Sequence, residues 1–148
     1  MARVLLTGMS GTGKTTVLHE LRRRGHLTVD TDYDGWVGTD GLWDEARMAR
    51  LLASTPAVVV SGTVDNQGRF YDRFDHIVLL SAPVDVLIER VSKRTNNTYG
   101  NDPEEQADIA SYLETVEPLL RRGSTLELDG RLSTSELADS IERLTARA

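Results

Sequence analysis

Residues 8–15 read Gly-Met-Ser-Gly-Thr-Gly-Lys-Thr, and this octapeptide follows directly on the apolar run Val4-Leu5-Leu6. The pattern Gly-x-x-x-x-Gly-Lys-Thr is that of a phosphate-binding loop between a strand and a helix. Gly8 and Gly13 allow backbone conformations with positive φ, so that successive N–H groups can point into one anion-binding concavity. The octapeptide therefore predicts a strand–loop–helix unit that binds polyphosphate.

Individual residues of this loop suit different parts of a nucleotide. Lys14 can reach the β- and γ-phosphates, and the Thr15 hydroxyl is placed to bind Mg²⁺. The helix expected to begin near Lys14 adds the positive end of its dipole. The candidate phosphate ligands are Gly8, Met9, Ser10, Gly11, Thr12, Gly13, Lys14, Thr15 and Thr16.

Composition restricts the class of protein. A chain of 148 residues fits a single domain, here residues 1–148, and its 39% hydrophobic and 27% charged residues are ordinary for a globular protein. The absence of cysteine excludes disulfides and thiolate sites. No apolar stretch is long enough to span a bilayer and residues 1–7 do not resemble a secretory signal, so we expect no membrane partner and a cytoplasmic location. The net charge of −6 argues against a long nucleic acid as partner.

Short apolar runs alternate with helical patterns along the chain. Strands are expected at 3–7, 27–30, 57–61, 76–80 and 125–128. Helices are expected at 14–24, 43–54, 83–94, 104–122 and 133–146. Such alternation predicts a parallel sheet with helices on both faces. We expect the three-layer α/β fold of P-loop NTPases, with five parallel strands in the order 2-3-1-4-5.

Two carboxylates follow the second expected strand, in the sequence Asp30-Thr31-Asp32. Ligands of such folds bind at the carboxyl ends of the strands, so this turn and the exit of the third strand should face the phosphate loop. One carboxylate could hold a metal-bound water while the other accepts a proton from an attacking hydroxyl. A solvated acidic turn would also explain the run, which includes Asp34, but its coupling to a phosphate loop favours a site.

Arg90 and Arg94 lie four residues apart on one face of the helix expected at 83–94. Arg94 leads into the turn-rich segment 95–103, which reads as a short lid. An arginine carried by a lid can neutralise charge on a transferred phosphoryl group and exclude water. A solvated helix face explains the same spacing equally well.

Two other nucleotide-dependent classes fit poorly. Asp65-Asn66-Gln67-Gly68 matches the Asp-x-x-Gly of GTPase switch regions, but the chain has no Asn-Lys-x-Asp motif for guanine. The third expected strand ends in Ser61-Gly62-Thr63 and lacks the aspartate of a typical Walker B motif, which disfavours ATPase motors. Metal binding therefore shifts toward Asp30.

With these features together, the chain resembles the nucleoside/nucleotide and shikimate kinase-like branch of P-loop small-molecule kinases. The resemblance rests on the phosphate loop, Val29-Asp30-Thr31-Asp32, the arginine pair, and residues 117–122, Glu-Pro-Leu-Leu-Arg-Arg. It implies that Lys14 and Thr15 hold phosphate and Mg²⁺, that Asp30 reaches the metal through water, and that Asp32 binds the acceptor hydroxyl and assists its deprotonation.

The resemblance also assigns the base and the lid. It implies that Arg90 covers the adenine, that Arg94 enters the phosphate site when the lid closes, and that the loop at Asp129 to Arg131 borders the base. Arg131 is thus a further candidate for nucleotide binding. Shikimate kinases carry three glycines where this chain has Ser61-Gly62-Thr63 and an arginine in the helix after the lid, where residues 104–117 contain no Arg or Lys. Shikimate itself is therefore disfavoured.

We accordingly expect phosphoryl transfer from ATP, with Mg²⁺, to a hydroxyl or phosphate of a small acceptor, either a nucleoside or nucleotide or a small metabolite. The acceptor region is expected at about 32–54, with Asp32, Arg47 and Gly62 as substrate ligands. Arg47 or Arg50 could bind an anionic group. The alternatives are a nucleotide-binding regulatory module or slow NTPase, and a kinase of oligonucleotide 5′-hydroxyls. Either a monomer or a homodimer is compatible with the sequence.

Overall fold

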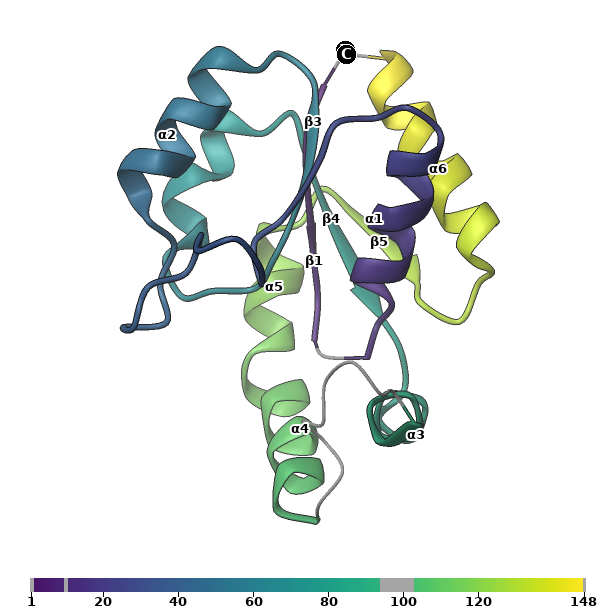
Figure 1. The fold of residues 1–148 in the computed structure, drawn as a ribbon. Coiled ribbons are helices and arrows are strands. Elements are labelled where there is room, and N and C mark those ends of the chain that lie inside the picture. Colours follow the sequence, from purple (N-terminus) through teal and green to yellow (C-terminus); the bar gives the residue numbers. More distant parts are fainter. Residues whose placement is uncertain (1, 10, 94–102, 148) are drawn as a thin grey trace.

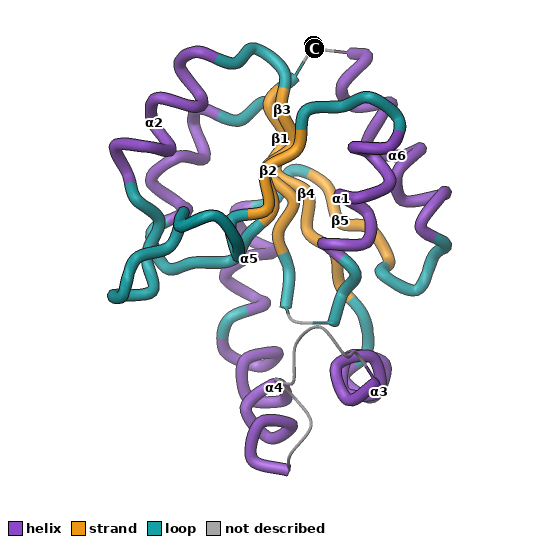
Figure 2. Tube along the Cα trace, in the orientation of Figure 1, coloured by secondary structure: helices purple, strands orange, loops and turns teal. Residues whose placement is uncertain are grey.

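The computed structural model describes residues 2–9, 11–93 and 103–147. It contains a five-stranded, all-parallel sheet, in which the strands are ordered β2-β3-β1-β4-β5 (Figures 1 and 2). The strands are β1 (Arg3–Thr7), β2 (Thr28–Asp30), β3 (Val58–Ser61), β4 (His76–Ser81) and β5 (Leu126–Asp129). The fold class and the strand order expected from the sequence are confirmed.

Helices cover both faces of the sheet. They are α1 (Lys14–Arg23), α2 (Glu45–Ser54), α3 (Val84–Lys93), α4 (Pro103–Thr115), α5 (Glu117–Gly123) and α6 (Thr134–Arg147), together with a 3₁₀ helix, η1 (Gln67–Arg73). Figure 1 shows α1 and α6 on one side of the sheet, α2 on the other, and α3 and α4 beyond the end of the central strands. None of the helices in the described part of the chain is both long and apolar enough to cross a membrane.

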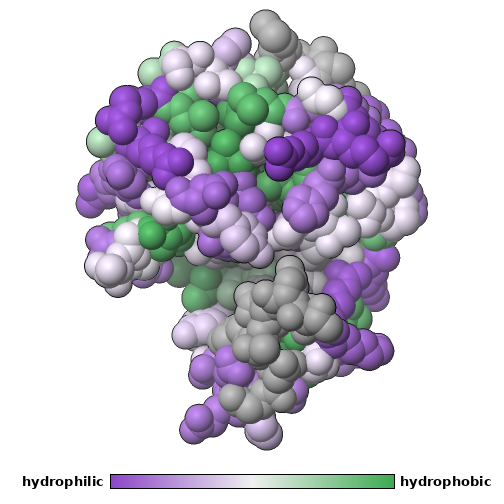
Figure 3. Space-filling view, in the orientation of Figure 1, coloured by the Kyte–Doolittle hydropathy of each residue, from purple (hydrophilic) through white to green (hydrophobic). Residues whose placement is uncertain are grey.

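Three hydrophobic clusters form the core of the described residues, and two of them are separated by the sheet, because the side chains of each strand point alternately to its two faces. Val4 and Leu6 of β1 pack with Leu18 and Leu21 of α1 and with Ile141 of α6. The residue between them, Leu5, faces the opposite side, where the core comprises Leu5, Trp36, Trp43, Met48, Leu52, Val58, Val60, Phe70, Phe74 and Ile77. Hydrophilic side chains cover much of the outer surface on both sides, as Figure 3 shows. Burial on both faces explains why the central strands read as unbroken apolar runs.

The helices differ from the sequence-based expectation in three main respects, besides shifts of one residue at other ends. The single helix expected at 104–122 is wrong: the structure has α4 and α5, separated at Val116. Pro118 lies in the first turn of α5 and has no N–H to continue the ladder of α4. Helix α2 begins at Glu45 rather than 43, because the Asp44 side chain accepts a hydrogen bond from Arg47 N and caps it. Helix η1 was not expected, since a 3₁₀ turn leaves no apolar periodicity.

The packing of α1 supports a first prediction. Leu21 is completely buried between the sheet and α6, whereas Leu27, just before β2, is 54% exposed. Leu21→Ala should lower the free energy of unfolding by about 2–5 kcal/mol, because it removes buried methyl groups and leaves a cavity. Leu27→Ala, the same change at an exposed site, should shift it by about 0.5 kcal/mol or less. Urea unfolding of both variants measures the difference, and equal losses would contradict this description of the core.

Candidate active site

The phosphate loop connects β1 to α1 and has the backbone that its glycines predict. The φ angles of Gly8 and Gly13 are +154° and +99°, and Gly13 is the N-cap of α1. A Cβ atom on Gly8 would collide with the carbonyl oxygen of Leu80 in β4. The loop is therefore packed against the sheet so closely that its first residue has to be glycine. Ser10 lies outside the described residues.

The Lys14 ammonium group points back into this loop. Its Nζ atom donates hydrogen bonds to the carbonyl oxygens of Gly8, at 2.6 Å, and Met9, at 3.1 Å. These are contacts with neutral acceptors, which the charged oxygens of a phosphate can replace with stronger, charge-assisted hydrogen bonds. Lys14 is thus held beside the anion-binding concavity, in agreement with its expected role, which stays a prediction.

Thr15 and Asp30 meet, as a shared magnesium site requires. The Thr15 hydroxyl donates to Asp30 Oδ2 at 2.9 Å, and the other oxygen, Oδ1, accepts from the backbone N of Asp32 at 3.1 Å. A hydroxyl and a carboxylate suit Mg²⁺, which takes few protein ligands and completes its shell with water and phosphate. Across residues 2–9, 11–93 and 103–147, no group of three or more acidic, His or Cys side chains could bind a metal by itself. The pair fits a metal delivered with a nucleotide.

The turn that carries Asp32 is anchored by its neighbour Thr31. The buried Thr31 hydroxyl donates to the Ser61 carbonyl oxygen at 2.8 Å and accepts from Trp43 Nε1 at 3.0 Å. Gly62 lies against the same pair, because a Cβ there would collide with Thr31 Oγ1 and lie 3.3 Å from the Trp43 ring. Asp32 itself is exposed. The structure thus explains Gly62 by packing, while its proposed contact with substrate is untested.

Arg47, on helix α2, also belongs to the expected acceptor region. Its guanidinium lies over the Trp36 ring, with Cζ 3.9 Å from the ring centroid, and its Nη1 donates to the Asp34 carbonyl oxygen at 2.7 Å. Both tryptophans of the chain are buried, Trp36 at 8% exposure and Trp43 at 2%. Both rings therefore belong to the hydrophobic core that contains Leu5 and Met48, and Trp36 fixes where the positive charge of Arg47 lies.

Arg90 connects the phosphate loop to the loop after β5. Its Nη1 donates to the Gly11 carbonyl oxygen at 3.1 Å, and its Nη2 donates to that of Gly130 at 2.8 Å. This clamp places the loop 129–131 beside the phosphate loop, as a border of a base site would require. Arg131 pairs with Asp129 at 2.9 Å, and this contact lowers the pKa of Asp129. Arg94 and residues 95–102 of the expected lid lie outside the described residues.

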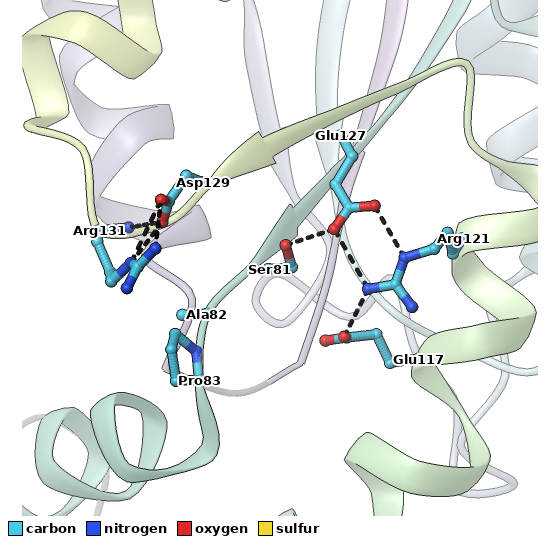
Figure 4. Close-up of a pocket in the computed structure, with 8 residues that line it drawn as sticks. All are labelled: Ser81, Ala82, Pro83, Glu117, Arg121, Glu127, Asp129 and Arg131. Carbon is cyan, nitrogen blue, oxygen red and sulfur yellow. Dashed lines mark hydrogen bonds and ion pairs between the residues drawn. The ribbon is translucent and has the colours of Figure 1, made fainter.

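A cavity of about 320 Å³ opens at the carboxyl ends of β4 and β5 (Figure 4). Its lining residues are Ser81, Ala82, Pro83, Glu117, Arg121, Glu127, Asp129 and Arg131. Arg121 bridges Glu127 and Glu117, at 2.8 Å to each, and its guanidinium lowers the pKa of Glu127. Arg121, in the last turn of α5, thus pairs within its own helix and also joins α5 to the edge strand β5.

Sequence reasoning missed the polar residues that hold the site together. Thr63 Oγ1 lies 2.7 Å from the Gly8 carbonyl oxygen and 3.0 Å from Thr7 Oγ1. Gln67, which is 2% exposed, donates to Thr7 Oγ1 at 3.1 Å. The only feature of the sequence that pointed to these residues was their position after the third strand. Hydroxyl and amide side chains do not form a recognisable sequence motif there.

Comparison with known proteins places this geometry in a family. The chain belongs to the AAA domain family, whose sequence pattern matches residues 4–111. No curated protein sequence is significantly similar to it.

Solved structures share the fold over nearly the whole chain. Shikimate kinase from Acinetobacter baumannii, in complex with shikimate, is 20% identical with a TM-score of 0.72, over 97% of this chain and 92% of that one. A gluconokinase from Sinorhizobium meliloti is 21% identical with a TM-score of 0.70, over 98% and 94%. The YorR protein from Bacillus subtilis, in complex with phosphorylated GDP, is 20% identical with a TM-score of 0.67, over 96% and 94%. The resemblance to P-loop small-molecule kinases is confirmed at the level of the fold.

The contact between Thr15 and Asp30 yields a prediction on metal dependence. Asp30→Asn keeps the shape of the side chain but removes its charge, so the Mg²⁺ concentration needed for half-maximal nucleotide binding should rise about 10–100-fold. Calorimetric titration of the nucleotide at a series of Mg²⁺ concentrations measures this shift. Asp72→Asn removes an exposed charge in η1 and should leave the Mg²⁺ dependence unchanged. An unchanged requirement in Asp30→Asn would move the metal away from Asp30.

Proposed function

We propose that this protein transfers the γ-phosphoryl group of ATP, as its Mg²⁺ complex, to a hydroxyl or phosphate of a small-molecule acceptor. The observation that carries the proposal is the meeting of Lys14, the Thr15–Asp30 pair and the acidic turn at Asp32 along one edge of the sheet. A nucleotide sensor needs only Lys14 and the Thr15–Asp30 pair. The exposed carboxylate of Asp32 beside them suits binding and deprotonation of an acceptor hydroxyl. The shared fold with shikimate kinase and gluconokinase supports the same reaction class.

Each residue acts on a defined atom in this reaction. The loop N–H groups and Lys14 bind the β- and γ-phosphates, and Thr15 and Asp30 orient the metal, which neutralises charge between these phosphates when bound. Asp32 accepts the proton of the acceptor hydroxyl while the oxygen of this hydroxyl forms a bond to the γ-phosphorus. The bond from this phosphorus to the β–γ bridging oxygen breaks, and ADP leaves. Because the transition state is loose, positioning and charge carry most of the catalysis.

Arg90 and the loop 129–131 delimit the proposed nucleotide site. Arg90 holds the carbonyl oxygens of Gly11 and Gly130 together, so we assign it the task of fixing the wall against which the adenine binds. Arg131 completes that wall. Arg94 remains the proposed cation that approaches the transferred phosphoryl group from the lid.

The acceptor is proposed to carry an anionic group. Arg47 is the cation held against the acceptor region, by its contacts with Trp36 and Asp34. Shikimate and gluconate, the compounds that name two of the similar kinases, are both hydroxylated carboxylates, and the third structure holds a phosphorylated nucleotide. Residues 104–117 contain no Arg or Lys to supply a second cation from α4, so we favour a hydroxylated or phosphorylated acid other than shikimate.

The acceptor can be found by coupled binding. A thermal-shift screen of nucleosides, nucleotides, sugar acids and hydroxy acids is run with and without a non-hydrolysable ATP analogue and Mg²⁺. Compounds that raise the unfolding temperature only together with the analogue occupy the second half of the site. If the analogue stabilises the protein and no compound adds to it, and ATP is hydrolysed slowly in water alone, the protein is a slow NTPase or nucleotide sensor.

Lys14→Ala should lower turnover about 10²–10³-fold, because it removes a preorganised cation from the developing phosphate charge. Release of ADP with the acceptor found above measures turnover, and thermal unfolding checks that the variant is folded. The matched control is Lys93→Ala, since Lys93 is an exposed lysine that pairs with Glu89 on α3. Wild-type turnover in folded Lys14→Ala would refute the phosphate-loop assignment.

Asp32→Asn should separate binding from transfer. The amide cannot accept the hydroxyl proton, so transfer should fall about 10²–10⁴-fold while the ATP analogue binds as in the wild type. Asp34→Asn, two residues along the same turn, should retain both properties. Loss of nucleotide binding in Asp32→Asn would instead place this carboxylate at the metal.

A further inference from the structure

The Thr63 hydroxyl contacts both polar groups of one residue of the phosphate loop. Thr63 follows β3, and its Oγ1 lies 3.2 Å from the Gly8 nitrogen, 2.7 Å from the Gly8 carbonyl oxygen and 3.0 Å from Thr7 Oγ1. Gly8 also packs against the Leu80 carbonyl oxygen of β4, which leaves no room for a Cβ atom. The first residue of the loop, with the peptide groups on both its sides, is therefore fixed between β4 and the exit of β3.

The chemistry of these groups dictates the direction of every hydrogen bond. The Gly8 carbonyl oxygen only accepts, so it takes the one hydrogen of the Thr63 hydroxyl. The Gly8 N–H in turn donates to the Thr63 hydroxyl oxygen. The Thr7 hydroxyl must then donate to Thr63, and it accepts in turn from Gln67 Nε2 at 3.1 Å. The Gln67 amide is itself oriented, because its Oε1 accepts from Val64 N at 2.9 Å. This chain of groups has no alternative arrangement with all donors satisfied.

Lys14 shares the acceptor at the end of this chain. Its Nζ lies 2.6 Å from the same Gly8 carbonyl oxygen that accepts from Thr63. The ammonium group has three N–H donors, and when phosphate binds they turn toward the ligand, so that the hydrogen bond to this oxygen of a buried residue weakens or breaks. A buried carbonyl left without a donor is costly, so the Gly8 carbonyl needs a second donor for Lys14 to move freely.

We propose that Thr63 is a positioning residue for phosphate binding: its hydroxyl keeps the Gly8 peptide hydrogen-bonded while Lys14 transfers from the loop to the nucleotide. This inference rests on the proposed nucleotide site. Without the Thr63 hydroxyl, the Gly8 carbonyl oxygen would keep only its hydrogen bond from Lys14 of the two described here. The ammonium group would then be held in the loop more strongly. The nucleotide would then bind more weakly even though it never touches Thr63.

The same fold contains a control for the purely structural effect of such a hydroxyl. Thr125 precedes β5, and its Oγ1 accepts from Ile77 N at 2.9 Å and donates to Ile77 O at 3.2 Å. Thr125 thus makes the same pair of hydrogen bonds as Thr63, at the start of β4 rather than at the phosphate loop. Removing either hydroxyl removes one donor and one acceptor from a neighbouring peptide.

The test compares Thr63→Val, Thr63→Ser and Thr125→Val with the wild type. Calorimetry measures the Kd of a non-hydrolysable ATP analogue with Mg²⁺, and urea unfolding measures stability. We expect Thr63→Val to raise the Kd about tenfold or more, and Thr63→Ser to stay within about twofold of the wild type. Thr125→Val should lose stability and retain the wild-type Kd.

Four results separate failure of this inference from failure of the proposed function. If Thr63→Val binds the analogue as tightly as the wild type, or if Thr125→Val weakens binding equally, the positioning role is overturned. If the wild type binds no nucleotide at all, the proposed function fails instead. A double-mutant cycle adds a readout that general destabilisation would not move: in a Lys14→Ala background, Thr63→Val should change the Kd less than about twofold, because no ammonium has to move. An undiminished effect there would also overturn the proposal.

Discussion

The position of β3 between β1 and β2 is the constraint on which the rest of the site depends. Ser61 is the register partner of Leu6 on one side and of Asp30 on the other. Because the strands are parallel, all three end at the same edge, and the phosphate loop, the acidic turn and the β3 exit begin there together. In this register Val60 of β3 lies beside Leu5 of β1 and Val29 of β2, so that apolar side chains pair across all three strands. The chemistry of the site is therefore a consequence of how the apolar strands pair.

Neutral polar groups join the ends of the strands at this edge. Thr31 joins the β2 turn to Ser61 and Trp43, and Thr63 joins the β3 exit to the phosphate loop. Hydroxyl and amide groups satisfy one another under burial without the desolvation cost of an ion pair. The charged groups Lys14 and Asp32 are thereby left near the surface of the edge, where a ligand can reorganise them. Rigid neutral supports and adjustable charges suit the proposed nucleotide site, whose ligand is highly charged.

The extent to which the sequence predicted this structure follows from the range of each interaction. The strands, the phosphate loop and the proximity of Thr15 to Asp30 were predictable, because apolar runs and a local motif encode them. The break between α4 and α5 was also readable from Pro118, although the helical pattern around it concealed the break. The contacts of Thr63 with Gly8, 55 residues apart, have no local signature, because they depend on how closely the loop packs on the sheet. Arg90 shows the same limit: its helical spacing was visible, but its carbonyl partners were not.

The two halves of the proposed site differ in what builds them. The nucleotide half consists largely of backbone groups held by glycine packing, Lys14 and the Arg90 clamp, so few substitutions in it are compatible with the fold. The acceptor half consists of side chains on the turn after β2 and on α2, supported from below by Trp36 and Trp43. Exposed side chains on a supported turn can change without disturbing a core, whereas the phosphate loop cannot. Under the proposed function, differences in acceptor among proteins of this fold should therefore arise at positions that correspond to Asp32 and Arg47.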